Sequence, residues 1–153
     1  MTAEISAGKL EVTGKLEIKA SRIPTIIIAR VKDKTPSGHP IAVYFDVKDE
    51  LFPFKEGDEV KVTLTKDRPS FKEGEDLVMW GYVVFKKSTI KQNEPVGEEK
   101  FVEGDLEEAE KGSRLFKLIA SFWGFMFEAV TTDEDILTAF PVMEKVYFKV
   151  TRA

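Results

Sequence analysis

The sequence predicts an all-β protein built as an antiparallel barrel or sandwich. Eight short runs of β-branched and aromatic residues alternate with polar residues, which is the period of a strand with one buried face. Turns rich in glycine separate most of these runs, and only one short segment has the signature of a helix. With 153 residues, of which 42% are hydrophobic, the chain can bury a core. We predict one domain over residues 1–153.

The first half of the chain contains four expected strands. Alternation over residues 10–18 indicates a strand with one exposed face, and Gly14 in its middle indicates a bulge or a bend. The β-branched run 26–31 indicates a strand covered on both sides. Residues 41–47 and 60–64 are the third and fourth strands.

The second half contains four more. They are residues 77–85, 115–121, 125–130 and 145–151. Gly124 lies at the junction of the sixth and seventh strands. The run 132–135 predicts a capping box that opens a short helical turn, which ends near Pro141.

An acidic insertion at about 87–114 interrupts the strand pattern. From Glu94 to Glu110 the sequence has eight acidic residues and a single basic one, Lys100. Residues 105–111 have the pattern of a helical turn that Gly112 would stop, and we expect the rest to be a solvated loop. Such a segment either contacts a basic partner surface or keeps a sheet edge soluble.

Composition limits the functional classes. The chain has no cysteine, which excludes disulfides, thiol catalysis and cysteine-based zinc sites. Its net charge of −4 argues against a protein that coats DNA. No apolar run approaches the ~18 residues that cross a bilayer, and the N-terminus lacks a secretory pattern. We expect an intracellular protein without a membrane partner.

No residue set indicates catalysis. The only histidine, His39, lies in a turn, and the acidic run 133–135 is typical of a helix N-terminus rather than of a calcium loop. Asp46 and Glu128 are the acidic residues in the most apolar surroundings, although each fits the outward position of an alternating strand. No phosphate loop or nucleophile motif is present. We expect no catalytic residues, no metal and no cofactor.

Nucleic-acid binding is the main alternative that composition leaves open. The first hairpin carries a basic set that could contact phosphates, and aromatic residues elsewhere could stack on bases. The basic candidates are Arg22, Arg30, Lys32 and Lys34, and the aromatic ones are Tyr44, Phe71, Trp80 and Tyr82. The basic residues also fit a solvated rim and the aromatic ones an ordinary core, and we favour this interpretation. The overall acidity would weaken affinity that depends on phosphates.

Three aromatic and glycine blocks suggest docking on a partner. They span residues 50–53, 78–81 and 121–127. In the run 122–127 nearly every side chain is large and apolar, so both faces of the strands would be apolar. A permanent partner that covers one face explains this pattern, because a free monomer would otherwise risk self-association.

The order of these blocks resembles the eighth subunit of archaeal and eukaryotic RNA polymerases, which in archaea is also known as the G subunit. The strand 41–47 followed by Leu51-Phe52-Pro53 resembles the family's Leu-Phe-Pro corner. Val78-Met79-Trp80-Gly81 resembles its Tyr-Val-Met-Tyr-Gly block, with Trp80 in the second aromatic position. Ser121-Phe122-Trp123-Gly124-Phe125-Met126 resembles its Ser-Phe-Gly-Gly-Leu-Leu-Met block, with Trp123 in place of the first glycine, and residues 147–152 resemble its basic C-terminal strand.

The resemblance implies an eight-stranded antiparallel barrel of the oligonucleotide-binding, Greek-key type. It implies a non-catalytic accessory subunit of DNA-directed RNA polymerase that docks on the largest subunit, in an archaeal cytoplasm because the eukaryotic loop at 66–75 is short here. The expected docking residues, or their supports, are Leu51, Phe52, Pro53, Trp80, Gly81, Phe122, Trp123 and Gly124. The alternative is a free-standing barrel that binds single-stranded nucleic acid; within a polymerase, that contact would be weak.

Overall fold

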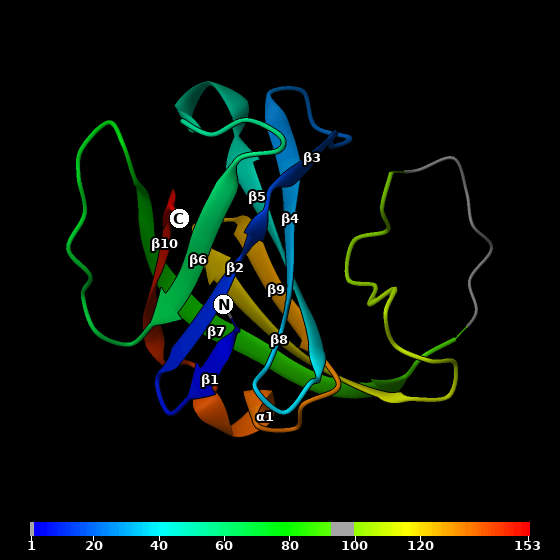
Figure 1. Ribbon diagram of the computed structural model, residues 1–153. Helices are drawn as coiled ribbons and strands as arrows, with labels where there is room; N and C mark the ends of the chain where they lie inside the picture. Colours follow the sequence, from blue (N-terminus) through cyan, green and yellow to red (C-terminus); the bar gives the residue numbers. More distant parts are fainter. Residues whose placement is uncertain (1, 93–99) are drawn as a thin grey trace.

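The computed structural model describes residues 2–92 and 100–153, and it confirms the all-β class (Figure 1). The strands are β1 (Glu4–Ser6), β2 (Lys9–Lys15), β3 (Glu17–Ala20), β4 (Ile26–Lys34), β5 (Pro40–Lys48), β6 (Glu59–Thr65), β7 (Leu77–Ile90), β8 (Arg114–Phe122), β9 (Phe125–Thr131) and β10 (Lys145–Arg152). The described part has two short helices, the 3₁₀ turn η1 (Asp49–Leu51) and α1 (Ile136–Ala139).

All described strand pairs are antiparallel and form one sheet in the order β1-β2-β6-β10-β7-β8-β9-β5-β4-β3. The prediction of eight strands closed into a barrel is corrected here, because the sheet has ten strands and its hydrogen-bonded order is open at β1 and β3. The run 10–18 divides at Leu16, whose N–H and C=O bond to Asp58 and Gly57 instead of to a strand. β1 has only three residues, too few to show a pattern.

The sheet curls until β2 lies against β4. The Thr13 N–H donates to Asp33 Oδ2 at 3.0 Å, so a side chain rather than a backbone ladder joins the two strands. A Cβ on Gly14 would lie 2.6 Å from the Lys32 carbonyl oxygen. The predicted bulge at Gly14 is absent, since the β2–β6 register runs through it unbroken. This glycine permits close approach of two strands, and the register shift in the sheet lies instead between Val83 and Phe85.

The main core fills the inside of the curled sheet. Its centre is a cluster of rings from Phe45, Phe122, Phe127 and Phe148, with centroids 5.0 to 6.5 Å apart. Ile136, Ala139 and Phe140 in and after α1 are also buried in this core. Helix α1 confirms the predicted helical turn, but the predicted capping box is wrong. Its N-cap Asp135 makes no side-chain cap bond, and Asp133 Oδ1 accepts the Asp135 N–H at 3.0 Å.

The acidic insertion packs on the outside of the sheet. Phe101 is 2% exposed and Leu106 is fully buried, and they form a second core with Ala42, Tyr44, Leu115 and Val130. The expectation of a solvated loop is therefore wrong for Phe101, Gly104 and Leu106, which are buried, although most other residues of 100–113 are exposed. The expected helical turn at 105–111 is wrong, because this stretch contains turns without a helix. Residues 93–99 of the predicted insertion lie outside the described residues. The two apolar side chains anchor the segment despite its charge.

We expect Phe101→Ala to release this segment while the main core stays folded. Removal of a buried phenylalanine costs about 3 kcal/mol or more. We expect a small second core of six residues to be unable to hold the segment after such a loss. Limited proteolysis should then cleave within residues 100–113. The control is Val102→Ala, because Val102 is 38% exposed. Equal resistance of wild type and Phe101→Ala would contradict this account of the anchor.

Candidate partner-docking surface

The β8–β9 hairpin turn holds a tryptophan in an unfavourable backbone conformation. Phe122 pairs with Phe125, so Trp123 and Gly124 form a turn of two residues. Their φ angles are 57° and 96°, and two positive angles define the turn type that best matches the twist of β-hairpins. Glycine, asparagine and aspartate suit the first position, whereas a bulky residue there is strained. The turn nevertheless exposes 74% of Trp123.

Close contact between β7 and β8 brings a second tryptophan to this turn. A Cβ on Gly81 would lie 2.0 Å from the Ser121 carbonyl oxygen, so the strands can approach only because this residue is glycine. Trp80 precedes it on the outer face of β7. The rings of Trp80 and Trp123 meet edge to face, with centroids 4.9 Å apart and planes at 90°. This geometry is a preferred one for aromatic pairs.

We call the exposed rings around this pair the aromatic surface. It comprises Phe71, Trp80, Tyr82, Trp123 and Tyr147. Tyr82 lies 6.2 Å from Trp80, and both are about 40% exposed. Tyr147 of β10 is opposite Trp80 in the ladder, and Lys145 Nζ lies 4.6 Å from the Trp80 centroid and 5.4 Å from the Tyr147 centroid.

A groove continues the aromatic surface toward the loop before β7. It has a volume of about 270 Å³, and Phe71, Trp80, Lys145 and Tyr147 contribute to its walls. Phe71 is 52% exposed and also lines a second groove of about 760 Å³, whose wall includes Pro53. Phe71 thus lines both grooves, and the larger one, whose other walls are mostly polar, reaches Pro53 after η1.

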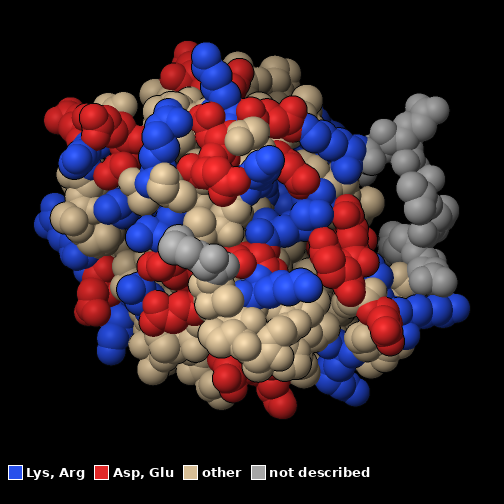
Figure 2. Space-filling model, in the orientation of Figure 1, with Lys and Arg blue, Asp and Glu red and all other residues tan. Residues whose placement is uncertain are grey.

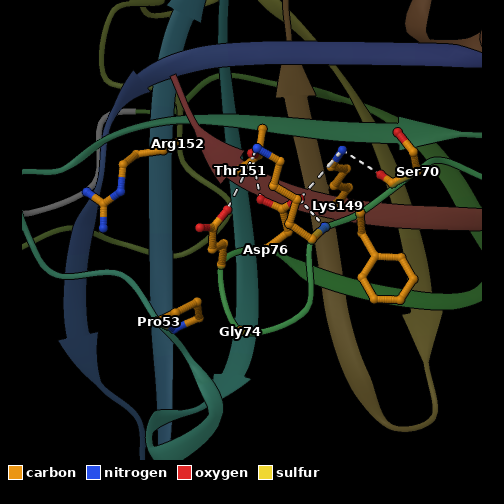
Figure 3. A pocket seen from close by; sticks show the side chains of 10 residues that line it. Pro53, Ser70, Gly74, Asp76, Lys149, Thr151 and Arg152 are labelled. Carbon is orange, nitrogen blue, oxygen red and sulfur yellow. Dashed lines mark hydrogen bonds and ion pairs between the residues drawn. The ribbon is translucent and has the colours of Figure 1, made fainter.

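The polar groups of the larger groove are paired with one another (Figure 3). Lys149 Nζ donates to the Ser70 carbonyl at 2.6 Å, and Thr151 Oγ1 donates to Asp76 Oδ1 at 2.7 Å. The backbone N–H of Lys72 donates to Asp76 Oδ2 at 2.8 Å, which is the largest cause of the lowered pKa of that carboxyl. These bonds fix the loop 68–76 beside β10. The groove therefore marks where the aromatic surface ends and paired polar groups begin.

The structure divides the predicted docking residues into an exposed group and a buried group. Leu51, Pro53, Trp80, Trp123 and Gly124 are exposed, whereas Phe52, Gly81 and Phe122 are buried. Phe52 and Phe122 belong to the main core, and Gly81 lies against the backbone of Ser121. Tyr82, Phe71 and Tyr147 were not among the predicted docking residues. Alternation places Tyr82 on the same face as Trp80, but Phe71 and Tyr147 join the surface through pairing of distant segments.

Two of the four predicted nucleic-acid-binding residues already have acidic partners. Arg30 is 3% exposed, bonds to Glu17 and Glu107, and stacks 4.6 Å from the Phe101 centroid. Burial opposes its charged form, but the bonds to the two carboxylates outweigh burial and raise the pKa of Arg30. Lys32 Nζ lies 3.1 Å from Glu108. Arg22 and Lys34 are exposed at opposite ends of β4. Nucleic-acid binding by these four residues stays a prediction.

Charges of both signs are interspersed on the face shown in Figure 2.

On the outer side of the sheet, Asp46 and Glu103 lie among other carboxylates. Burial raises the pKa of Asp46, against a bond that the Met126 N–H donates to it at 3.2 Å. Burial, together with the charges of Asp46 and Glu128, raises the pKa of Glu103. Glu128 also pairs with Lys117 at 3.8 Å.

Within the described residues, no group of three or more acidic, histidine or cysteine side chains could hold a metal ion. His39 Nδ1 lies 2.8 Å from Thr132 Oγ1, and this contact joins two loops.

A search of the described helices found none that is long and apolar enough to span a membrane.

The fold and the aromatic surface define an all-β protein of the kind that associates with other chains. The chain belongs to the RpbG family, the G subunits of DNA-directed RNA polymerase, because the model of that family matches residues 9–153. This confirms the resemblance noted from the sequence blocks. A comparison with curated proteins found no match. The chain is therefore an accessory subunit of a multi-subunit RNA polymerase.

We expect Gly81→Ala to destabilise the protein by about 2–3 kcal/mol, because the added methyl group must push β7 away from β8. Urea denaturation measures this change. Gly74→Ala is the comparison, since no atom lies within 4 Å of its added Cβ and it reports only the strain of a positive φ, 79°, which Gly81 does not have. A loss of less than about 1 kcal/mol in Gly81→Ala would show that the contact with Ser121 does not limit the sheet.

We expect Asp46→Asn to increase the free energy of unfolding at pH 7. The folded-state pKa of Asp46 is raised, so ionisation above that pKa costs stability, and the amide removes this cost while it keeps an acceptor for Met126. The gain should disappear as the pH falls to about 3, where the carboxyl is protonated in both states. Urea denaturation at pH 7 and at about pH 3 tests this, with exposed Glu134→Gln as the control. A gain that persists at about pH 3 would contradict the assignment.

Proposed function

We propose that this chain is a non-catalytic subunit that docks on the largest subunit of RNA polymerase through the aromatic surface. The observation that carries the proposal is the exposure of Trp123 in a strained turn. In the isolated fold the exposed tryptophan gains only its edge-to-face contact with Trp80, and glycine or asparagine would suit the turn better. Strain of this kind at an exposed site indicates a functional constraint on the residue.

The composition of the aromatic surface fits a protein interface. Tryptophan and tyrosine are enriched among the residues that dominate binding energy, and they cluster at the centres of interfaces. Trp80 and Trp123 are already in contact, so little side-chain entropy remains to be lost when a partner covers them. Lys145 over the rings supplies a polar rim. The mechanism is structural: the subunit holds a segment of its partner in place and does no chemistry itself.

Two finer assignments belong to this proposal. The curled sheet, in which β2 and β3 pass from β6 to β4, supports an oligonucleotide-binding type of barrel. The short 66–75 segment and the family support an archaeal, cytoplasmic polymerase.

We expect Trp123→Asn to weaken binding to the purified largest subunit by about 30-fold, as removal of a hot-spot side chain does. Asparagine tolerates positive φ, so the turn should keep its form and the free energy of unfolding should not fall. Titration by isothermal calorimetry measures the affinity, and circular dichroism checks the fold. Trp123→Asp should have the same effect on binding.

The matched control is Ile23→Asn, which removes a 63% exposed apolar side chain outside the aromatic surface. It should bind as the wild type does. Wild-type affinity of folded Trp123→Asn would contradict the proposed dock, and an unfolded Trp123→Asp would make Trp123 a structural residue.

A further inference from the structure

The second half of β7 is a sheet edge with hydrogen-bonding groups that face no described strand of this chain. β10 pairs with β7 from Leu77 to Tyr82, whereas β8 pairs with it as far as Ile90. Residues 84–90 therefore have a ladder on one side only. The last bonds on the other side join Val83 to Met143 and Glu144. Met143 has a φ of 71°, which turns the chain away from β7 at this point.

The register identifies which backbone groups point out of this edge. Lys91 donates to the Ser113 carbonyl at 2.7 Å and accepts from the Gly112 N–H at 2.9 Å, so both of its groups point toward β8. In an antiparallel ladder these directions alternate along the strand. The register has no shift from Phe85 to Ile90. The N–H and C=O groups of Lys86, Ser88 and Ile90 therefore point away from β8.

The other two edges of the sheet are protected. β1 has three residues, which is too short to template a strand. On β3, Glu56 Oε1 accepts the Ile18 N–H at 3.2 Å, and Lys100 Nζ donates to the Ile18 carbonyl at 3.3 Å. Proteins usually block edges in such ways, and a long exposed edge is a template for another chain. Within the described part of the chain, no side chain bonds in this way to the outward N–H and C=O groups of residues 84–90.

The side chains along this edge define what a partner strand must carry. Val84 is 38% exposed and Ile90 is 46% exposed, and Val142, beside the point where the chain turns away, is 47% exposed.

The β7–β8 arm is also basic. β7 and β8 contain two basic residues each and no acidic one; the four are Lys86, Lys87, Arg114 and Lys117. Lys86 Nζ donates to the carbonyls of Leu137 and Phe140, and Lys117 pairs with Glu128. Lys87 and Arg114 have no acidic partner among the described residues. A complementary strand would place acidic side chains beside Lys87 and apolar ones beside Ile90, on opposite faces.

We propose that residues 84–90 of β7 accept an extended segment of a partner polymerase subunit, with alternating acidic and apolar side chains, as an added strand. The inference rests on the proposed function, since it takes the partner from the polymerase. It adds a mode of binding, in which backbone hydrogen bonds give affinity and alternate side chains give specificity. The edge continues the strand that carries Trp80 and Tyr82, so one partner can cover both.

Amide hydrogen exchange, read residue by residue, tests the added strand. In the free chain, the amides of Lys86, Ser88 and Ile90 should exchange faster than those of Lys87 and Thr89, which face β8. With the purified largest subunit bound, the first three should slow about 100-fold and the other two should change little. Binding without this alternating protection would overturn the added strand and leave the proposed dock standing.

Failure of the chain to bind the largest subunit would overturn both proposals. Protection of the same three amides in the chain alone, rising with its concentration, would mean that a second copy fills the edge and would also overturn the inference.

A matched pair of variants provides a second readout. Ser88→Pro removes an N–H that points out of the edge and leaves the bonds to β8 intact, so it should reduce affinity about tenfold. Ser88→Ala loses the same side-chain bond to Arg114 but keeps the N–H, and it should bind as the wild type does. Equal affinities of the folded pair would contradict the proposal; if Ser88→Pro does not fold, the exchange measurement decides.

Discussion

The close approach of β7 and β8 at Gly81 is the constraint on which the outer surface depends. The backbone of Ser121 occupies the space that any side chain at position 81 would need. This contact sets β7 directly beside the β8–β9 turn, so Trp80 and Trp123 meet although they are far apart in sequence. β8 and its neighbour β9 bury Phe122 and Phe127 on their inner face. One glycine therefore links the packing of the core to the arrangement of the rings outside it.

A second set of contacts holds the acidic segment against another part of the sheet surface. Arg30 binds Glu107 and lies against Phe101, and the Tyr44 hydroxyl donates to the Asp105 carbonyl, which holds the acidic segment to β4 and β5. Because the acidic residues neutralise basic ones of the same chain, this face offers less positive charge than its sequence indicates. The proposed docking therefore lies on the side of β7, where the aromatic surface and the open edge adjoin.

Local signals in the sequence predicted all eight of the longer strands, from alternation or β-branched runs, and the short helix, from the acidic run before it. They missed β1, the break at Leu16 and the extension of β7 to Ile90, which depend on bonds to distant segments. The docking blocks could be found as apolar runs that are too dense for a free surface. Their division into exposed and buried residues could not, since the positive φ of Trp123 decides which way the run 122–127 faces. The packing of Phe101 was missed because acidic neighbours obscured it.

The most direct test of the central claim uses the two tryptophans, which are the only ones in the chain and both lie in the aromatic surface. The chain labelled with 5-fluorotryptophan should give two fluorine NMR signals that are sensitive to exchange of H₂O for D₂O. On addition of the unlabelled largest subunit, the account predicts that both signals shift and lose much of that sensitivity, because the partner excludes water from the rings. Formation of the complex with both signals unchanged would contradict it.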